Sequence, residues 1–420
     1  MTARGRACLL GAVVAAALSS CAGGDPGPDA AAPVDPASAV PAACRDVAID
    51  PFKELIIVDE GLLASGRASN RQNGPWSFRH AFENLLPPGQ DLSAALDAWF
   101  GLYKQPTTVN LFRVPARLGN VIDGTVECPW LKRTPSNGCN ESCSVCAARV
   151  FDLAEAPFRL IAIANRLDLR ETSAYPGGAG EGRLVFALTD GPADDPASPA
   201  LRMTAALEYY LPSARSSPFE WAARWHRLGA HEAFDEPFAA ELVALTEQFV
   251  ARGADPAAPL GGSLAQVRTN EREFDWQWEF REFRLAPGAN RLALSPLFNT
   301  PDRSLNGAPQ LVSWASENRD AILRNQHTLP LGLTGGVAVP TPPWLLPGLG
   351  EQVRKALASQ TCDGCHQTEQ TSLDVNFHVS PMRPGVGKLS PFLHDPAAPT
   401  DELRKRADAL RRALCASSDP

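Results

Sequence analysis

Residues 158–188 read FRLIAIANRLDLRETSAYPGGAGEGRLVFAL, and this stretch decides the fold. It holds two apolar runs, 158–164 and 183–188, and a third run follows at 203–211. Each run looks like a buried strand, and turn-rich segments separate them. A parallel crossover needs a dozen or more residues, usually as a helix, and no helix-length spacer is present here. The three runs therefore predict an antiparallel meander.

Two helices and two further strands are predicted after the meander. Apolar side chains recur at helical spacing over 221–228 and 237–249, and Pro237 suits the first turn of the second helix. Residues 274–280 alternate aromatic with polar side chains, which is the period of a half-buried strand. Residues 292–297 can return as its partner strand. These elements extend the meander into a mixed fold.

The remaining segments divide the chain. Residues 52–63 alternate between apolar and charged side chains and predict a strand, whereas 92–99 has the spacing of a packed helix. Glycine and proline are frequent in 336–348, which is typical of a linker or a covering segment. We therefore expect an α+β body with an antiparallel sheet and packed helices over 44–335, and a small all-α module over 349–420.

The N-terminal end resembles a bacterial lipoprotein signal. Residues 1–20 carry two arginines and then an apolar run that is too short to span a bilayer, which takes about 20 apolar residues. The run ends in LSSC, residues 18–21, which resembles a lipobox. The small residues admit the peptidase, and the Cys21 thiol accepts the lipid. An ordinary secretion signal cut near Ala22 is the alternative.

The segment after the signal predicts an anchored location. Residues 21–43 contain too few large apolar side chains to offset the entropy of ordering, so we expect a flexible tether. Ala22 stands where an aspartate would resemble an inner-membrane retention signal, which favours the outer membrane. We expect a lipid-anchored protein of the cell envelope, on the periplasmic face or the surface.

The charge of the chain argues against nucleic acid as a partner. The formal net charge is −8, and loss of the two signal-peptide arginines shifts it to about −10. Nucleic-acid binding depends on clustered lysine and arginine, which an acidic protein lacks. The expected partners are the membrane, through the N-terminal lipid, and a redox partner protein.

Eight cysteines follow Cys21, and outside the cytoplasm thiols usually form disulfides or bind a cofactor. Four of them cluster within nineteen residues, namely Cys128, Cys139, Cys143 and Cys146. Four such cysteines can hold zinc, but two disulfides that staple a polar loop are favoured in an oxidising compartment. Two more, Cys44 and Cys415, are then left to pair and tie the ends together.

The last two cysteines belong to Cys362-Asp363-Gly364-Cys365-His366, a C-x-x-C-H motif. Two thiols at this spacing can add to the vinyl groups of one porphyrin, and the next imidazole can bind the iron. The Cys143–Cys146 pair is followed by alanine, and histidine would follow by chance about 2% of the time. The motif therefore predicts covalently bound haem c. A local disulfide and a metal site are the alternatives.

The flanking sequence supports a haem module. Apolar side chains at helical spacing run over 349–357 into the motif, and a second amphipathic helix follows Thr400. Two residues are candidates for the sixth iron ligand. Met382 would give a high-potential haem, and His378 would give bis-histidine ligation at lower potential. A site without either ligand is the third possibility.

Three other features have ordinary structural readings. The glycines of 178–182 precede a strand, not a helix, so they predict a hairpin loop and not a phosphate site. Asp168 and Glu181 can be paired acids for hydrolysis, or polar residues at a strand end. No nucleophile elbow and no H-E-x-x-H motif is present. Four isolated histidines are expected to be structural, namely His80, His226, His231 and His327.

Several stretches together resemble a known group. They are the lipobox and the segments 76–78, 158–170, 180–186, 266–271, 279–283, 361–366 and 377–378. The chain is similar over most of its mature length to a group of large, uncharacterised bacterial lipoproteins with a single C-terminal C-x-x-C-H. That resemblance implies architecture and location but no activity. Separately, the last 75 or so residues resemble a minimal cytochrome c, through the motif and its two helices.

The leading hypothesis is a lipid-anchored envelope protein with one c-type haem on Cys362, Cys365 and His366, which transfers single electrons or senses redox state. A second hypothesis is a haem-free binding or structural protein with a Cys362–Cys365 disulfide. A third is a hydrolase in the α+β body.

Overall fold

The computed structural model describes residues 40, 44–132, 139–140, 143, 145–146, 148–175, 178–212, 216–258, 261–286, 291–368, 376–397 and 401–415. The predicted signal peptide, Cys21 and, apart from Val40, the tether lie outside the described residues. Within the described part, no helix is long and apolar enough to cross a membrane.

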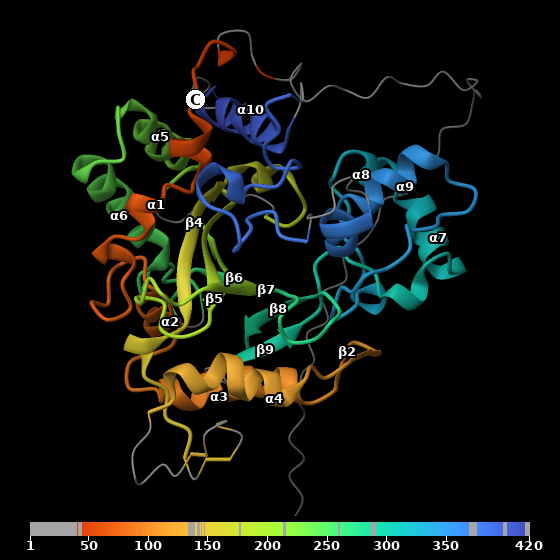
Figure 1. Ribbon diagram of the computed structural model, residues 1–420. Helices are drawn as coiled ribbons and strands as arrows, with labels where there is room; N and C mark the ends of the chain where they lie inside the picture. The colour runs from red at the N-terminus through yellow and green to blue at the C-terminus, as the bar shows by residue number, and fades with distance from the viewer. Residues whose placement is uncertain are drawn as a thin grey trace, which may run out of the picture.

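A seven-stranded antiparallel sheet forms the centre of the molecule, in the order β1-β4-β5-β6-β7-β8-β9 (Figure 1). The strands are β1 (Ile56–Ile57), β4 (Phe158–Arg166), β5 (Glu181–Thr189), β6 (Ala200–Tyr210), β7 (Leu264–Glu271), β8 (Glu279–Leu285) and β9 (Leu292–Ser295). Consecutive strands from β4 to β9 are neighbours, so the predicted meander is confirmed and extended.

Two strand predictions were wrong in extent. Within 52–63 only Ile56–Ile57 is a strand, because Asp50 accepts a hydrogen bond from the Phe52 amide and Pro51 starts a helical turn over Pro51–Leu55. The aromatic alternation over 274–280 lies mostly in a bent segment, and β8 begins only at Glu279.

Helices and a small hairpin surround the sheet. They are α1 (Glu60–Leu63), α2 (Phe78–Leu85), α3 (Leu92–Lys104), β2 (Thr107–Val109), β3 (Phe112–Val114), α4 (Gly119–Val121), α5 (Pro218–Arg227), α6 (Glu236–Val250), α7 (Pro309–Glu317), α8 (Arg319–Leu323), α9 (Glu351–Ala358) and α10 (Glu402–Cys415). The helices predicted around 92–99, 221–228 and 237–249 are confirmed. Ser217 and Glu220 form a capping box that starts α5, and Asp235 caps α6.

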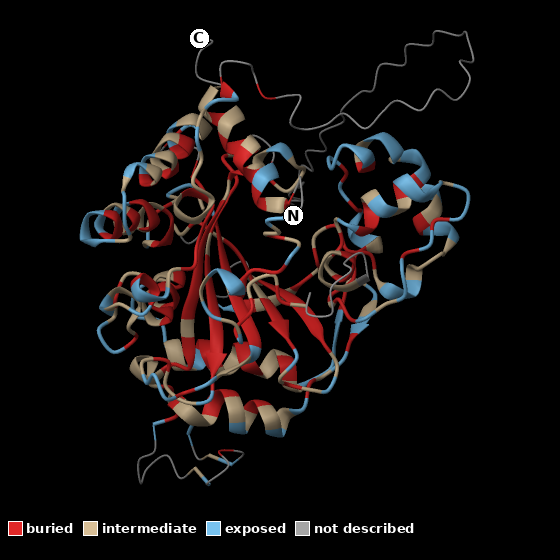
Figure 2. Ribbon diagram, turned by 45° about the horizontal axis from the view of Figure 1, so that its top comes forward, coloured by how far each residue is buried: buried red, intermediate tan, exposed pale blue. Residues whose placement is uncertain are grey.

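One face of the sheet is apolar and packs an aromatic core. The Phe78 ring of α2 stacks on Phe158 of β4 at 4.4 Å between ring centroids, and Trp99 of α3 meets Phe283 of β8 edge-on at 6.0 Å. The strands are buried along most of their length (Figure 2). Helices and strands share this core, so together they form the α+β body.

The opposite face of the same strands is polar and yet also buried. It carries Arg166, Glu181, Arg183, Glu208, Arg268 and Glu282, whose side chains follow the period-2 alternation across paired positions of β4 to β8. Glu181 of β5 and Glu208 of β6 are at most 1% exposed. The C-terminal part of the chain lies over this face, and it brings the C-x-x-C-H motif there.

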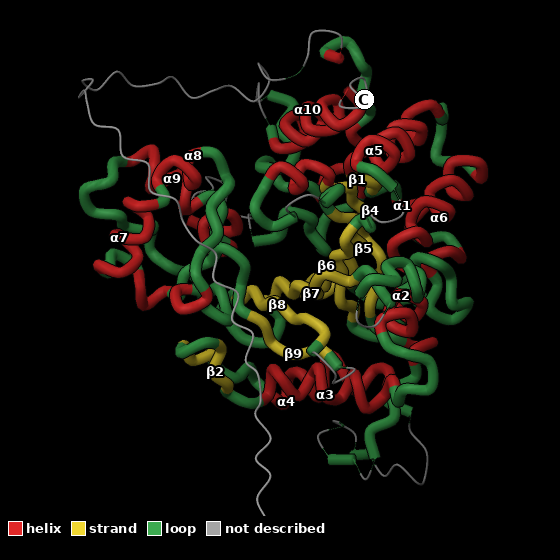
Figure 3. The backbone as a smooth tube through the Cα atoms, turned by 180° about the vertical axis from the view of Figure 1, so that it is seen from behind, coloured by secondary structure: helices red, strands yellow, loops and turns green. Residues whose placement is uncertain are grey.

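The structure does not confirm a separate cytochrome c-like module. The helix before the motif, α9, packs with α7 and α8 around Leu311, Trp344 and Leu357. By contrast, α10 packs against α5 and the Leu167–Glu171 turn and joins the main core. The group α7–α9 stands apart from α5 and α6 in both views (Figures 1 and 3). The two helices that were expected to pair therefore contact different parts of the molecule.

The 336–348 segment acts as a covering segment. Ala338 and Trp344 are buried, and the backbone of Ala338 bridges Phe280 of β8 in antiparallel fashion. The segment therefore ties the α7–α9 group to the sheet.

Candidate cofactor site at the C-x-x-C-H motif

A tight turn after α9 positions the motif. The Thr361 hydroxyl accepts a hydrogen bond from the Gly364 amide at 3.0 Å, and the Thr361 carbonyl accepts one from the Cys365 amide at 2.9 Å. A Cβ at position 364 would overlap the carbonyl oxygen of Ala358. Glycine therefore fits this turn because a side chain has no room.

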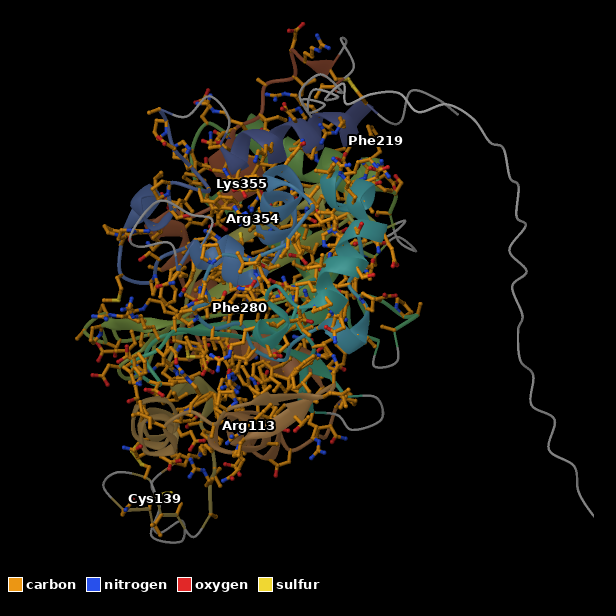
Figure 4. All side chains as sticks on the ribbon, turned by 90° about the vertical axis from the view of Figure 1, so that its right-hand side faces the viewer. Arg113, Cys139, Phe219, Phe280, Arg354 and Lys355 are labelled. Atoms are coloured by element: carbon orange, nitrogen blue, oxygen red, sulfur yellow. A yellow bond between two sulfur atoms is a disulfide. The ribbon has the colours of Figure 1, made fainter. Side chains whose placement is uncertain are left out.

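The cysteines separate into two groups. Six lie at disulfide distance in three pairs, Cys44–Cys415, Cys128–Cys143 and Cys139–Cys146. These pairs agree with the expected disulfides, and Cys139 lies in a loop well away from Phe280 (Figure 4). Among the described cysteines, Cys362 and Cys365 alone are not in a disulfide. The motif thus keeps two thiols at porphyrin-attachment spacing.

His366 presents one ring nitrogen to the site. Its Nδ1 lies 3.0 Å from the carbonyl oxygen of Asn376, so Nδ1 carries the proton and donates it. The Asn376 side-chain amide in turn donates to the carbonyl of His366 at 3.3 Å. Because Nδ1 is engaged, Nε2 keeps its lone pair for a metal, as in most histidine-ligated metal sites.

His378 lies directly opposite. Its ring centroid is 4.3 Å from that of His366, and its Nε2 is 3.3 Å from the Cys365 sulfur. Its Nδ1 contacts the Ser390 hydroxyl at 3.1 Å, which fixes the ring orientation. The His378 ring therefore contacts both the His366 ring and the Cys365 thiol.

The other candidate ligand lies elsewhere. Met382 is 57% exposed, and its amide donates to the hydroxyl of Ser380. Its side chain is therefore at the surface and not beside the two histidines.

The body contributes the aromatic wall of the site. The ring of Phe280 lies 5.0 Å from that of His366, and Trp278 stacks on His366 at 6.1 Å. The Trp278 indole donates to Asn270 of β7 at 2.6 Å, and the Asn270 amide donates to the carbonyl of Asn376. Figure 4 shows Phe280 toward the middle of the molecule. Sequence reasoning identified these aromatic residues as strand residues but missed their place at the site.

Burial keeps the site uncharged at neutral pH. It lowers the pKa of His366 to about 4, with Arg268 and Arg183 adding to the effect. Burial also lowers the pKa of His378 well below its usual value, and His366 adds to that effect. It raises the pKa of Cys362 to about 11 and that of Cys365 to about 12. Neutral imidazole is the metal-binding form, and protonated thiols exchange slowly with external disulfides.

Asp168 lies in the Leu167–Glu171 turn after β4 and Glu181 at the start of β5, and both are engaged with arginines. Arg166 donates two hydrogen bonds to Asp168, each of 2.9 Å, and Arg183 and Tyr175 bond Glu181. Burial raises the pKa of Glu181, whereas for Asp168 the effect of Arg166 outweighs burial and the pKa is lowered. Both carboxylates are therefore members of an ion network with these arginines.

The remaining sequence candidates have structural roles. Three histidines pair with carboxylates at 2.8–2.9 Å: His80 with Glu247, His226 with Glu54, and His231 with Glu241. His327 is buried against Trp314, and neither ring nitrogen has a hydrogen-bond partner within the described residues. Gly182 packs against Phe249 at the start of β5, as expected of a hairpin loop.

The residues around the motif include the donor types that c-type haem uses. They offer two thiols, two imidazoles with their Nδ1 atoms engaged, and flanking aromatic rings. The described residues contain no group of three or more histidine, cysteine, aspartate or glutamate side chains arranged to hold a metal ion. A flat macrocycle between the histidines requires their rings to part from the 4.3 Å separation observed. Comparisons with protein families, with curated proteins and with solved structures found no match to this chain.

Proposed function

We propose that this chain is a lipid-anchored protein of the cell envelope that carries one c-type haem and transfers single electrons or senses redox state. The observation that carries the proposal is that free thiols and imidazoles lie together at the motif. Two thiols at C-x-x-C spacing are outside disulfides, the Nε2 of His378 lies 3.3 Å from the Cys365 sulfur, and the Nδ1 of His366 is engaged by the carbonyl of Asn376. When bound, the haem supplies a one-electron couple at its iron.

Each residue of the site then has a defined task. Cys362 and Cys365 would hold the porphyrin through thioether bonds, and His366 would bind the iron. The carbonyl of Asn376 holds the proton of His366 on Nδ1 and so keeps Nε2 available. Trp278 and Phe280 cover the His366 ring and would exclude water from it.

The sixth ligand proposed is His378, because it faces His366 and its ring is oriented by Ser390. Met382 is exposed and is therefore the weaker candidate. Two histidine ligands favour a lower reduction potential than a histidine and methionine pair.

The envelope location rests on the lipobox-like 18–21 segment and on the disulfides. Three disulfide pairs are typical of a protein that matures in an oxidising compartment. Attachment of c-type haem takes place outside the cytoplasm as well. The anchor at Cys21 would then keep a flexible tether between the lipid and the body.

The test is expression of the full chain with the cytochrome c maturation machinery. The wild type should show a Soret band and a covalent mass gain of one haem, and Cys362→Ala should lose the thioether to that sulfur. The double variant Cys139→Ser/Cys146→Ser removes a cysteine pair far from the motif and should retain the haem. A wild-type protein without haem, with Cys362 and Cys365 joined to each other, would instead support the haem-free binding or structural protein.

A second experiment identifies the sixth ligand. Ferric haem with two histidine ligands lacks the near-infrared band of methionine ligation. His378→Ala should convert the spectrum to a high-spin form, and Met382→Ala should leave it unchanged. The reverse result would assign the ligand to Met382.

A further inference from the structure

One thiol of the motif has an imidazole beside it. The Cys365 sulfur lies 3.3 Å from Nε2 of His378, and Nδ1 of His378 lies 3.1 Å from the hydroxyl of Ser390. Nucleophilic thiols in enzymes show this order of contacts, in which an imidazole contacts the sulfur and a third polar group orients the imidazole. Ser390 is fully buried, so the ring that it contacts is held in place. The arrangement is that of a nucleophile with its base.

The protonation states suit such a pair. Burial raises the pKa of Cys365 to about 12 and lowers that of His378 well below its usual value, so the resting groups are a thiol and a neutral imidazole. The thiol then donates to Nε2 of His378, and Nδ1 donates to Ser390. A protonated thiol exchanges slowly by itself, and a neighbouring imidazole that accepts its proton removes that obstacle.

The described conformation leaves the thiols open to a substrate instead of a porphyrin. The rings of His366 and His378 are 4.3 Å apart, which leaves no room for a flat macrocycle between them. Cys362 and Cys365 are both partly exposed. Among the described cysteines the other six are paired, so an external reagent meets these two thiols.

A second thiol lies within reach of the first. Cys362 and Cys365 are three residues apart in one helical turn, in which the Cys365 amide donates to the carbonyl of Thr361. Side chains at this spacing have Cβ atoms about 5–6 Å apart, and a disulfide needs about 3.5–4.5 Å. A small change in the turn therefore lets the pair pass between dithiol and disulfide.

The backbone argues against acyl transfer by the same thiol. An acyl-transfer site needs free donors, often backbone amides, to stabilise the oxyanion. The Gly364 amide donates to the Thr361 hydroxyl at 3.0 Å, and the Cys365 amide donates to the Thr361 carbonyl at 2.9 Å. These two amides are therefore engaged, whereas thiol–disulfide exchange needs a thiolate and a disulfide.

We propose that the chain without haem exchanges thiols with external disulfides, with Cys365 as the nucleophile, His378 as its base and Cys362 as the resolving thiol. The sulfur of Cys365 attacks one substrate sulfur as His378 takes the thiol proton, and the substrate S–S bond breaks. The leaving thiolate takes that proton from His378. The thiol of Cys362 then attacks the Cys365 sulfur and releases the second substrate thiol with the remaining proton.

The substrate thus gains two electrons and two protons, and the chain is left with a Cys362–Cys365 disulfide. An external dithiol returns the pair to its reduced form by the same steps in reverse. The activity does not rest on the proposed function, because it belongs to thiols that carry no porphyrin.

The first test follows the reaction of oxidised glutathione with the full chain, purified without haem and with Cys362 and Cys365 reduced. The wild type should release two glutathione thiols per chain and end with a Cys362–Cys365 disulfide. Cys362→Ala should stop at a mixed disulfide on Cys365, identified by peptide mass mapping. If Cys362 in the Cys365→Ala variant takes up glutathione at the same rate, the base has no effect and the inference is wrong.

The second test measures initial rates in the Cys362→Ala background, which removes the resolving step. Adding His378→Gln should slow formation of the mixed disulfide about 100-fold, since a general base contributes at least that much. Adding His231→Gln is the control, because His231 pairs with Glu241 of α6, and it should leave the rate unchanged. Loss of the fold would expose the thiol and speed its reaction, so misfolding does not explain a slower variant. Equal rates for the two histidine variants would overturn the inference.

Haem attachment distinguishes this inference from the proposed function. A chain that exchanges disulfides but takes up no haem from the maturation machinery would support the inference and contradict the proposed function. A chain that takes up haem, and whose haem-free form shows neither rate difference, would do the reverse.

Discussion

Glu271 of β7 should make the protein less stable as the pH rises. Its carboxyl is fully buried and its Oε1 accepts a hydrogen bond from Thr269 at 2.6 Å. Its other oxygen, Oε2, lies 3.5 Å from Arg117 Nε and 3.8 Å from Arg281 Nε but accepts no hydrogen bond within the described residues. Burial therefore outweighs these arginines and raises the pKa of Glu271 from 4.5 to about 7.

Proton binding by Glu271 is linked to folding, and this linkage gives both the direction and the size of the change in stability with pH. The folded protein holds this proton more tightly than the unfolded chain. The resulting contribution to the free energy of unfolding is complete below pH 4.5 and is lost as the pH rises through about 7. With about 1.4 kcal/mol for each pH unit, the loss is about 3 kcal/mol. Glu271→Gln mimics the neutral carboxyl and does not titrate. Relative to the wild type, its free energy of unfolding should rise by about 3 kcal/mol between pH 4.5 and 8.

The neighbouring strand provides a control of opposite sign. Glu208 of β6 is just as buried, but Arg183 and Arg268 outweigh the effect of burial and lower its pKa. Its stabilisation is present above pH 4.5 and is lost as the pH falls through the folded-state pKa. Glu208→Gln should therefore be destabilised most at high pH. Urea unfolding of both variants and the wild type at pH 3, 4, 5, 6, 7 and 8 measures the differences. A Glu271→Gln variant whose stability stays parallel to that of the wild type would refute the reasoning.

Three further changes test the packing and the disulfides. Gly364→Ala places a Cβ against the carbonyl of Ala358, so it should cost about 1–3 kcal/mol in urea unfolding and reduce haem attachment. Trp99→Ala empties a site that is 1% exposed in the aromatic core and should cost about 3–5 kcal/mol, measured from the urea midpoint. Cys44→Ser removes the link to Cys415 across 371 residues and should cost about 2–5 kcal/mol; unchanged stability after alkylation of the free thiol would contradict that pairing.

Local sequence patterns predicted much of the architecture. The apolar runs over 158–164, 183–188 and 203–211 predicted three strands of the meander, and helical spacing predicted α3, α5 and α6. These predictions succeeded because the periods of strands and helices are properties of consecutive residues. The pattern over 52–63 failed because Asp50 and Pro51 start a helical turn there, and a capping contact overrides an alternation of this length.

The sequence by itself determined the motif, the cysteines outside it and the alternating faces of the strands. Only the tertiary structure decided that the polar face of β4 to β8 is buried, that Phe280 meets His366, and that His378 and not Met382 lies at the site. The physical reason is distance along the chain. A period-2 pattern looks the same whether its polar side meets water or another segment, and that choice is made by packing between residues a hundred or more positions apart.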